Sequence, residues 1–477
     1  MDRPESLTDS NSRPLDTVPL IDPHNDDDVQ ADNNQQSVLL IESDPSHSPL
    51  DPHLHIPERS RMPAPGAWST YLLPEELRGF KRYKYSAVDT SPLSNYVMHP
   101  FWNALVPYVP RSIAPNTLTL SGFLLIVLNF AVLSYYDYDL TAAGNPAHFI
   151  PRWVWWFVAF NHFWAHTLDG LDGKHARRTE SSSPLGELFD HGLDSWVTTL
   201  HCLCLYSVFG REPEYGIPTV RMFVALWLML VLFSLSHWEK YNTGILYLPW
   251  GYDFSQVVGL IVYIITGIWG QGVWHMKLPV LGISPGVGFE LSLYAGAVFL
   301  TIPTTLRNMY RAYANKTLKH NSFVEAMRPL SPITILLVVT LLWGVLSPNR
   351  ILFTDLRAFS WMTGTVCSNI TCALIITQMS LTKARWFHWL LVPVILAFTG
   401  VMGLSVMVEH ELTTVYALTV LVTVAQIHYG FSVVHQMASF LNIYAFSISK
   451  PPLHTPRGSL LERIDEDVDN GKTGNRH

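Results

Sequence analysis

The sequence predicts an all-α membrane protein that crosses the bilayer about ten times. Of the 477 residues, 48% are hydrophobic and only 14% are charged, whereas charged residues make up roughly 25% of an ordinary soluble domain. A membrane-spanning helix needs about 20 mostly apolar residues. The candidate spans lie near residues 118–136, 152–168, 192–209, 218–236, 255–273, 286–304, 331–347, 358–381, 387–406 and 413–437.

The two ends of the chain differ in composition from this apolar region. The first 66 residues contain thirteen Asp or Glu and only four Lys or Arg, with many Pro and Ser, and such a composition cannot bury enough apolar surface to fold. We therefore expect disordered tails over residues 1–66 and 450–477 and a membrane domain over residues 67–449, with its spans within 118–437. Residues 73–110 mix charged, aromatic and Pro residues, which favours an amphipathic helix in the headgroup region over a solvated connector.

The basic residues are distributed unevenly between the predicted loops. If the basic segment 78–84 lies in the cytosol, the loops that follow even-numbered spans contain eleven Lys or Arg, and the loops that follow odd-numbered spans contain six. Cytosolic loops normally carry this excess. We therefore expect both termini to face the cytosol.

Two acidic stripes at helical spacing lie where the second predicted span ends and the third begins. Residues at i, i+3, i+4 and i+7 share one face of a helix. The first stripe consists of Asp169, Asp172, Gly173 and Ala176, and the second consists of Gly186, Asp190 and Asp194. Between them, Ser183 followed by Pro184 is typical of an N-cap and a first helical residue. The stripes are thus expected to face each other across a helical hairpin at the cytosolic ends of these spans.

The composition of the stripes indicates metal-assisted phosphoryl chemistry. Four carboxylates in a low-dielectric cluster repel one another unless a cation joins them, and oxygen ligands without cysteine favour Mg²⁺, Mn²⁺ or Ca²⁺ over zinc. The small residues Gly173, Ala176 and Gly186 leave room for a flat ligand against the backbone, and two metal ions beside such a slot can hold a diphosphate. Arg177 and Arg178 add positive charge at the rim, or act as ordinary membrane anchors.

The stripes also match, at every defined position, the motif D-x₂-D-G-x₂-A-R-x₈-G-x₃-D-x₃-D. On this motif the chain resembles the CDP-alcohol phosphotransferase family. The segments 84–89, 114–119 and 236–253 are similar to the eukaryotic ethanolaminephosphotransferase branch, and the resemblance covers roughly residues 70 to 450.

The resemblance implies an enzyme that transfers phosphoethanolamine from CDP-ethanolamine to 1,2-diacylglycerol, giving phosphatidylethanolamine and CMP. It implies Mg²⁺ or Mn²⁺, expected as two ions, bound by Asp169, Asp172, Asp190 and Asp194. The expected catalytic groups are Asp194, Asp190 and His191, with Asp194 or a histidine, His191 or His237, as the base. The residues expected to shape the CDP site are Asn116, Gly173, Ala176, Arg177 and Gly186.

The implied lipid pathway places the protein in the membrane of the endoplasmic reticulum or the Golgi, with the active site facing the cytosol. Its partners would be CDP-ethanolamine, diacylglycerol and the bilayer, with a homodimer compatible with the resemblance and no nucleic acid. One alternative is a choline or dual-specificity phosphotransferase. A quaternary ammonium usually binds in an aromatic cage, and sixteen Trp and twenty Tyr offer too many candidates for the sequence to decide. The alternative from another class is a cation-coupled transporter, which does not need the motif.

Overall fold

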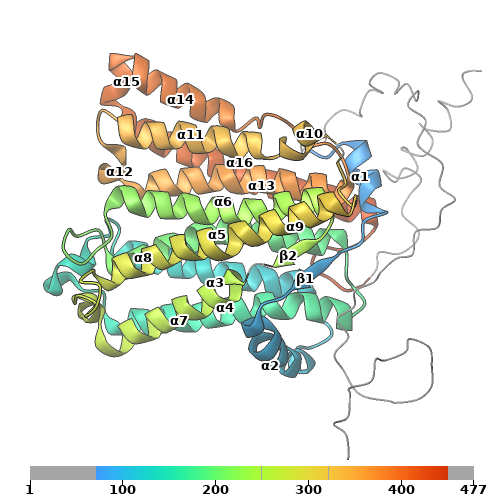
Figure 1. Ribbon diagram of the computed structural model, residues 1–477, viewed down its shortest axis with the longest axis horizontal. Helices are drawn as coiled ribbons and strands as arrows, with labels where there is room; N and C mark the ends of the chain where they lie inside the picture. Colours follow the sequence, from blue (N-terminus) through green and yellow to red (C-terminus); the bar gives the residue numbers. More distant parts are fainter. Residues whose placement is uncertain (1–70, 249, 321, 450–477) are drawn as a thin grey trace, which may run out of the picture. The chain divides into compact units, whose positions relative to one another are not determined.

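The computed structural model describes residues 71–248, 250–320 and 322–449. Its long helices run side by side in a bundle, and loops and short helices connect them at the two ends (Figure 1). The expected disordered tails, 1–66 and 450–477, lie outside the described residues, so their disorder stays a prediction.

The bundle consists of helices of very different lengths. In chain order they are α1 (Pro74–Phe80), α2 (His99–Leu105), α3 (Pro115–Tyr136), α4 (Arg152–Arg178), α5 (Pro184–Phe209), α6 (Thr219–Thr243), α7 (Gly251–Trp269), α8 (Pro285–Gly296), α9 (Ile302–Ala314), α10 (Phe323–Met327), α11 (Leu330–Leu346), α12 (Ile351–Thr354), α13 (Leu356–Ser380), α14 (Leu391–Gly403), α15 (Ser405–Glu409) and α16 (Glu411–Leu441). Short 3₁₀ or π turns are η1 (Ser94–Met98), η2 (Val106–Tyr108), η3 (Ala142–Gly144), η4 (Pro146–His148), η5 (Gln271–Trp274) and η6 (Ala297–Thr301).

The all-α prediction is confirmed, and a helix lies at each predicted span. Among the described residues, six helical stretches are long and apolar enough to cross a membrane: α3, α6, α7, α13, α16 and the continuous stretch 285–314 formed by α8, η6 and α9. The helices α11 and α14 are apolar but shorter. The acidic helices α4 and α5 are not among the six. The chain is thus an integral membrane protein, but the predicted number of about ten spans is not confirmed.

Helix α13 lies at the centre of the bundle, where nearly all of its residues are buried. Small polar side chains allow membrane helices to approach closely and to form hydrogen bonds between them. The hydroxyls of Ser368 on α13 and Ser195 on α5 are 2.6 Å apart. A Cβ atom added at Gly364 would lie only 2.0 Å from the Thr199 hydroxyl oxygen. This close contact fixes α5, which carries half of the acidic motif, against the centre of the protein.

Residues 73–110 form several short elements, although the sequence favoured one amphipathic helix. The three-residue strand β1 (Ala87–Asp89) separates α1 from η1, α2 and η2. It pairs in parallel with β2 (Leu246–Leu248), which follows α6. Pro110 explains the end of the last turn, because proline disfavours helical geometry in the residue before it and Val109 is extended. Strands this short show no periodicity by which the sequence could have predicted them.

Candidate active site

The acidic motif folds as the predicted helical hairpin. Helix α4 ends at Arg178 and α5 begins at Pro184, with the Ser183 hydroxyl accepting the backbone N–H of Gly186 at 3.2 Å. The Arg178 guanidinium donates to the carbonyl oxygens of Val106 at 2.8 Å and Val109 at 2.7 Å. It therefore ties the hairpin to the segment that precedes α3.

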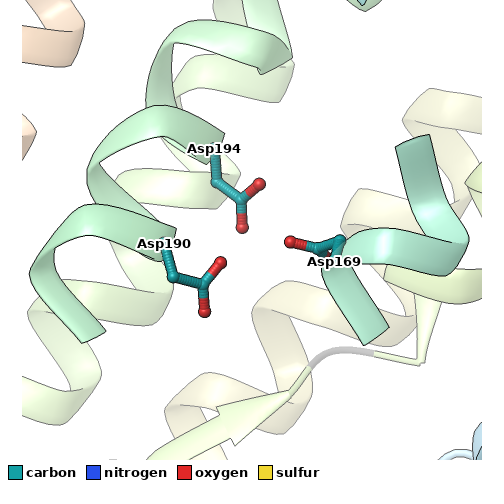
Figure 2. Close-up of side chains that lie close together, drawn as sticks. All are labelled: Asp169, Asp190 and Asp194. Carbon is teal, nitrogen blue, oxygen red and sulfur yellow. The ribbon is translucent and has the colours of Figure 1, made fainter. Parts of the chain in front are cut away.

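Three of the four motif aspartates point into a common space between α4 and α5 (Figure 2). One carboxylate oxygen from each of Asp169, Asp190 and Asp194 lies within 4.8 Å of the other two, and all three residues are half-buried. The Tyr252 hydroxyl donates to Oδ2 of Asp169 at 2.9 Å. The buried Oδ1 of Asp190 has no hydrogen-bond partner. Along the described segments, no Lys or Arg forms an ion pair with these carboxylates, so the group fits a hard divalent cation.

The fourth motif aspartate, Asp172, lies outside this group of three. Its buried carboxylate accepts a hydrogen bond from the Thr119 hydroxyl of α3 at 2.5 Å. It also lines a neighbouring cavity that Asp190 shares. The motif therefore divides into a cluster of three carboxylates and one further carboxylate held by α3.

The neighbouring cavity is polar and has a volume of about 790 Å³. The five residues that the sequence assigned to the CDP site all line it, namely Asn116, Gly173, Ala176, Arg177 and Gly186. The hairpin turn 179–183 and the segment 443–449, which follows α16, complete its wall. The Asn116 side-chain amide donates to the carbonyl oxygen of Ala445 at 2.8 Å, so the C-terminal segment contacts a predicted nucleotide residue.

A second cavity, of about 50 Å³, adjoins the carboxylates. Asp169 and Asp194 line it together with Phe123, Ile126 and Val197. Motif carboxylates thus line both cavities, and the wall of the smaller one also contains His166, His201 and Gln256.

The two histidines considered as bases lie side by side next to the cluster. The ring of His191 lines the polar cavity, and its Nε2 is 3.6 Å from Oδ2 of Asp190. The His237 ring lies 5.3 Å from the His191 ring, but its Nδ1 is 3.2 Å from the Gln378 side-chain nitrogen. Because His237 lines neither cavity, the geometry favours His191 of the two.

One wall of the polar cavity contains a buried carboxylate that the motif did not predict. The Tyr83 hydroxyl donates to Oε1 of Glu187 at 2.8 Å, and the Lys240 ammonium forms an ion pair with the same oxygen. Burial first, and then the negative charge of Glu187, raise the pKa of Tyr83 well above its usual value. The phenol of Tyr83 therefore stays protonated. The half-exposed ring of Tyr85 also lies on the cavity wall.

Several contacts that sequence reasoning missed come from segments that it had already singled out by resemblance. Thr119 belongs to 114–119, Tyr85 to 84–89, and Lys240 and Tyr252 to 236–253. Their similarity to a family was visible in the sequence, but their contacts were not, because each joins residues far apart in the chain. The resemblance therefore indicated that these residues contribute to the site, but not which motif residue each of them contacts.

This fold and site define a polytopic membrane protein with a carboxylate cluster suited to a divalent cation. A family model described as CDP-alcohol phosphatidyltransferase matches residues 112–280. The chain is 48% identical over 381 residues to ethanolaminephosphotransferase 1 of Homo sapiens, covering 80% of this chain and 95% of the human protein. It is 46% identical over 381 residues to the Mus musculus protein of that name, with the same coverage. Choline/ethanolaminephosphotransferase 1 of Arabidopsis thaliana is 31% identical over 386 residues, covering 77% of this chain and 96% of the plant protein.

The chain therefore belongs to the CDP-alcohol phosphatidyltransferase family, as the motif indicated. It is a transferase, which is the class that the family description names. The transporter alternative is thereby set aside.

Proposed function

We propose that this chain transfers phosphoethanolamine from CDP-ethanolamine to 1,2-diacylglycerol, producing phosphatidylethanolamine and CMP. The main support is that the motif carboxylates Asp172 and Asp190 line a polar cavity of about 790 Å³, next to the carboxylate cluster. Cavities of roughly 300–1,000 Å³ bind ligands of nucleotide size. Ethanolamine is favoured over choline by the names of the human and mouse relatives, whereas the plant relative's name covers both head groups.

The donor would lie with its cytidine against the small residues of the hairpin. Gly173 and Gly186 line the polar cavity without side chains, and Asn116 presents an amide beside Gly186. The diphosphate would extend towards Asp172 and Asp190, and Arg177, exposed at the rim, would offset part of its negative charge. In this position the phosphorus to be attacked would lie next to the carboxylate cluster.

We propose Mg²⁺ or Mn²⁺ as the cofactor, present as two ions. The ions would be held by Asp169, Asp190 and Asp194, with Asp172 as a further ligand from the side of the polar cavity. The unpartnered buried oxygen of Asp190 supports this assignment, because a buried anionic oxygen without a partner is costly. When bound, a divalent cation neutralises charge on the diphosphate as CMP leaves.

The reaction would be a direct displacement at the β-phosphorus of the donor. The diacylglycerol hydroxyl oxygen forms a bond to this phosphorus, while the bond from the phosphorus to the oxygen that bridges to CMP breaks, and CMP leaves with the electron pair. Asp194, which lines the smaller cavity beside the cluster, would accept the hydroxyl proton. Asp190, which faces the donor cavity, would bind and orient the donor. His191 is the alternative base.

The cellular setting follows from the substrates. We propose residence in the endoplasmic reticulum or Golgi membrane with the hairpin and both termini in the cytosol, supported by eleven basic residues against six in the predicted loops. CDP-ethanolamine would arrive from the cytosol and diacylglycerol from the bilayer. Assembly as a homodimer is compatible with this arrangement.

The test compares phospholipid formation from CDP-ethanolamine and CDP-choline by purified protein in detergent with diacylglycerol and Mg²⁺ or Mn²⁺. We expect ethanolamine-selective product that disappears in Asp190→Asn. The matched control is Asp355→Asn, because Asp355 is also buried but contacts Tyr138 and Tyr416 away from the cluster. Equal use of both donors would contradict the head-group assignment. Full activity of Asp190→Asn would contradict the carboxylate site.

A further inference from the structure

Two loops at one end of the bundle form a basic and aromatic surface that the proposed reaction does not use. Residues 315–329 and 381–390 contain five Lys or Arg and a single acidic residue, Glu325. The loops lead into the apolar helices α11 and α14, which pack side by side at one edge of the bundle (Figure 1). We call this region the Arg328 surface, and it consists of Lys319, Phe323, Arg328, Lys383, Arg385 and Trp386.

Direct contacts hold the two loops together, although the residues that meet are 56 and 58 positions apart. The Lys383 ammonium pairs with Oε1 of Glu325 at 2.6 Å. Nη1 of Arg328 donates to the carbonyl oxygen of Ala384 at 3.4 Å. The Arg328 guanidinium also lies over the Trp386 ring, 5.1 Å from its centre. The fold therefore brings the charges of both loops into one surface.

The end of α6 fixes the position of this surface. The Tyr241 ring stacks on the His320 ring with their centres 4.1 Å apart, and the Tyr241 hydroxyl accepts the backbone N–H of Ala384 at 3.3 Å. Lys240, the preceding residue of α6, pairs with Glu187 in the first turn of α5. The Arg328 surface therefore lies at the end of the bundle where α4 and α5 are joined.

Most of the positive charge on the surface is not neutralised by the protein. Within the described segments, Lys383 pairs with Glu325, and no carboxylate forms an ion pair with Lys319, Arg328 or Arg385. The side chains of Lys319 and Arg385 are exposed. Three cations are therefore available to an anion that approaches the surface.

The surroundings of these cations fit a lipid head group better than a soluble anion. Phe323 is 78% exposed and Trp386 is 50% exposed, and aromatic rings beside basic residues are typical of the membrane interface. The apolar helices α11 and α14 begin at Leu330 and Leu391, only a few residues beyond Arg328 and Trp386. The cations thus lie where the hydrocarbon region begins, at the depth of the lipid phosphates.

We propose that the Arg328 surface binds the head group of an anionic phospholipid from the adjoining leaflet. Arg328, held on Trp386, would contact the phosphate, and Lys319 and Arg385 would balance the remaining negative charge. Clusters of Lys and Arg beside membrane helices attract anionic lipids in this way, whereas the ammonium of a zwitterionic lipid would be repelled by the three cations. None of the six residues lines either cavity of the candidate active site. The inference therefore goes beyond the proposed function and does not depend on it.

The test uses native mass spectrometry of the full-length protein released from detergent micelles that contain equal amounts of phosphatidylserine and phosphatidylcholine. We expect the wild type to retain more phosphatidylserine. In the double variant Lys319→Gln with Arg385→Gln, the ratio of bound phosphatidylserine to phosphatidylcholine should fall roughly tenfold or more, the effect of two cations near an anionic lipid. The matched control is Arg82→Gln with Lys84→Gln, which removes the same charge from exposed side chains between α1 and β1. Its ratio should stay at the wild-type value.

The other outcomes contradict the inference. A wild type that retains both lipids equally overturns it. A control whose ratio falls as far as that of the double variant also overturns it, because general positive charge would then explain the binding. If the double variant changes the number of chains in the particle, the surface contacts a second copy instead of a lipid. If the double variant does not fold, Arg385→Gln alone decides, since its exposed side chain leaves no buried void, and an unchanged ratio overturns the inference.

Discussion

Replacing Gly186 by alanine should separate the stability of the hairpin from the binding of the donor. A Cβ atom added at Gly186 would lie 3.6 Å from the Asn116 side-chain oxygen and 3.7 Å from the Ser183 hydroxyl, which are ordinary contact distances. Alanine in place of glycine stabilises a helix by roughly 0.5–1 kcal/mol. The same methyl group would enter the slot proposed for cytidine. Filling a well-packed space in this way typically costs about 1–3 kcal/mol, which corresponds to roughly a 5- to 150-fold higher KM for the donor.

The assay combines thermal unfolding in detergent with the donor dependence of phospholipid formation. The matched control is Gly192→Ala on the same helix, where the new Cβ would lie 3.4 Å from the Cys372 sulfur and would not line the cavity. This control should keep the wild-type KM. A Gly186→Ala protein with an unchanged donor KM would refute the placement of cytidine against this residue. A lowered melting temperature would refute the argument that the methyl group fits the fold.

Three further predictions follow from the geometry of the hairpin and the cluster. Ser183→Ala removes the N-cap of α5 and should lower the free energy of unfolding by about 1 kcal/mol; unchanged denaturant unfolding would contradict this. Tyr252→Phe removes the hydroxyl that donates to Asp169 and should lower kcat roughly tenfold or more, whereas a wild-type kcat would show that this bond does not orient the carboxylate. A chelator should abolish product formation, and added Mg²⁺ or Mn²⁺ should restore it; activity that survives chelation would contradict the metal assignment.

The sequence predicted the features that depend on local signals. The start of α5 followed from Ser183 and Pro184, and the acidic stripes followed from helical spacing, so the hairpin is where it was expected. The positions of the long helices followed from apolar runs, because burial in lipid requires them. The number of membrane spans did not follow from these runs, because α4 and α5 carry the charged motif and α11 and α14 are short.

The rest of the site depends on contacts between distant parts of the chain. The bond between Asn116 and Ala445 joins residues 329 positions apart, and the ion pair of Glu187 with Lys240 joins residues 53 positions apart. No periodicity or capping signal encodes such pairs. The strand β1 brings Tyr83 and Tyr85 to the cavity by pairing with β2, and neither three-residue strand is long enough to show a pattern.

Glu239 and Lys240 show why adjacent charges in an apolar helix cannot be interpreted from sequence alone. Their opposite signs suggest that they neutralise each other, but successive residues of a helix point about 100° apart. Glu239 accepts hydrogen bonds from Thr305 at 2.9 Å and Asn308 at 2.8 Å on α9, whereas Lys240 turns to Glu187 on α5. Each charge therefore needs a partner from another helix, because an unpaired charge in the membrane is costly. The packing of α5 against α6, and not the local sequence, thus determines that the ammonium of Lys240 pairs with Glu187, whose side chain lines the donor cavity.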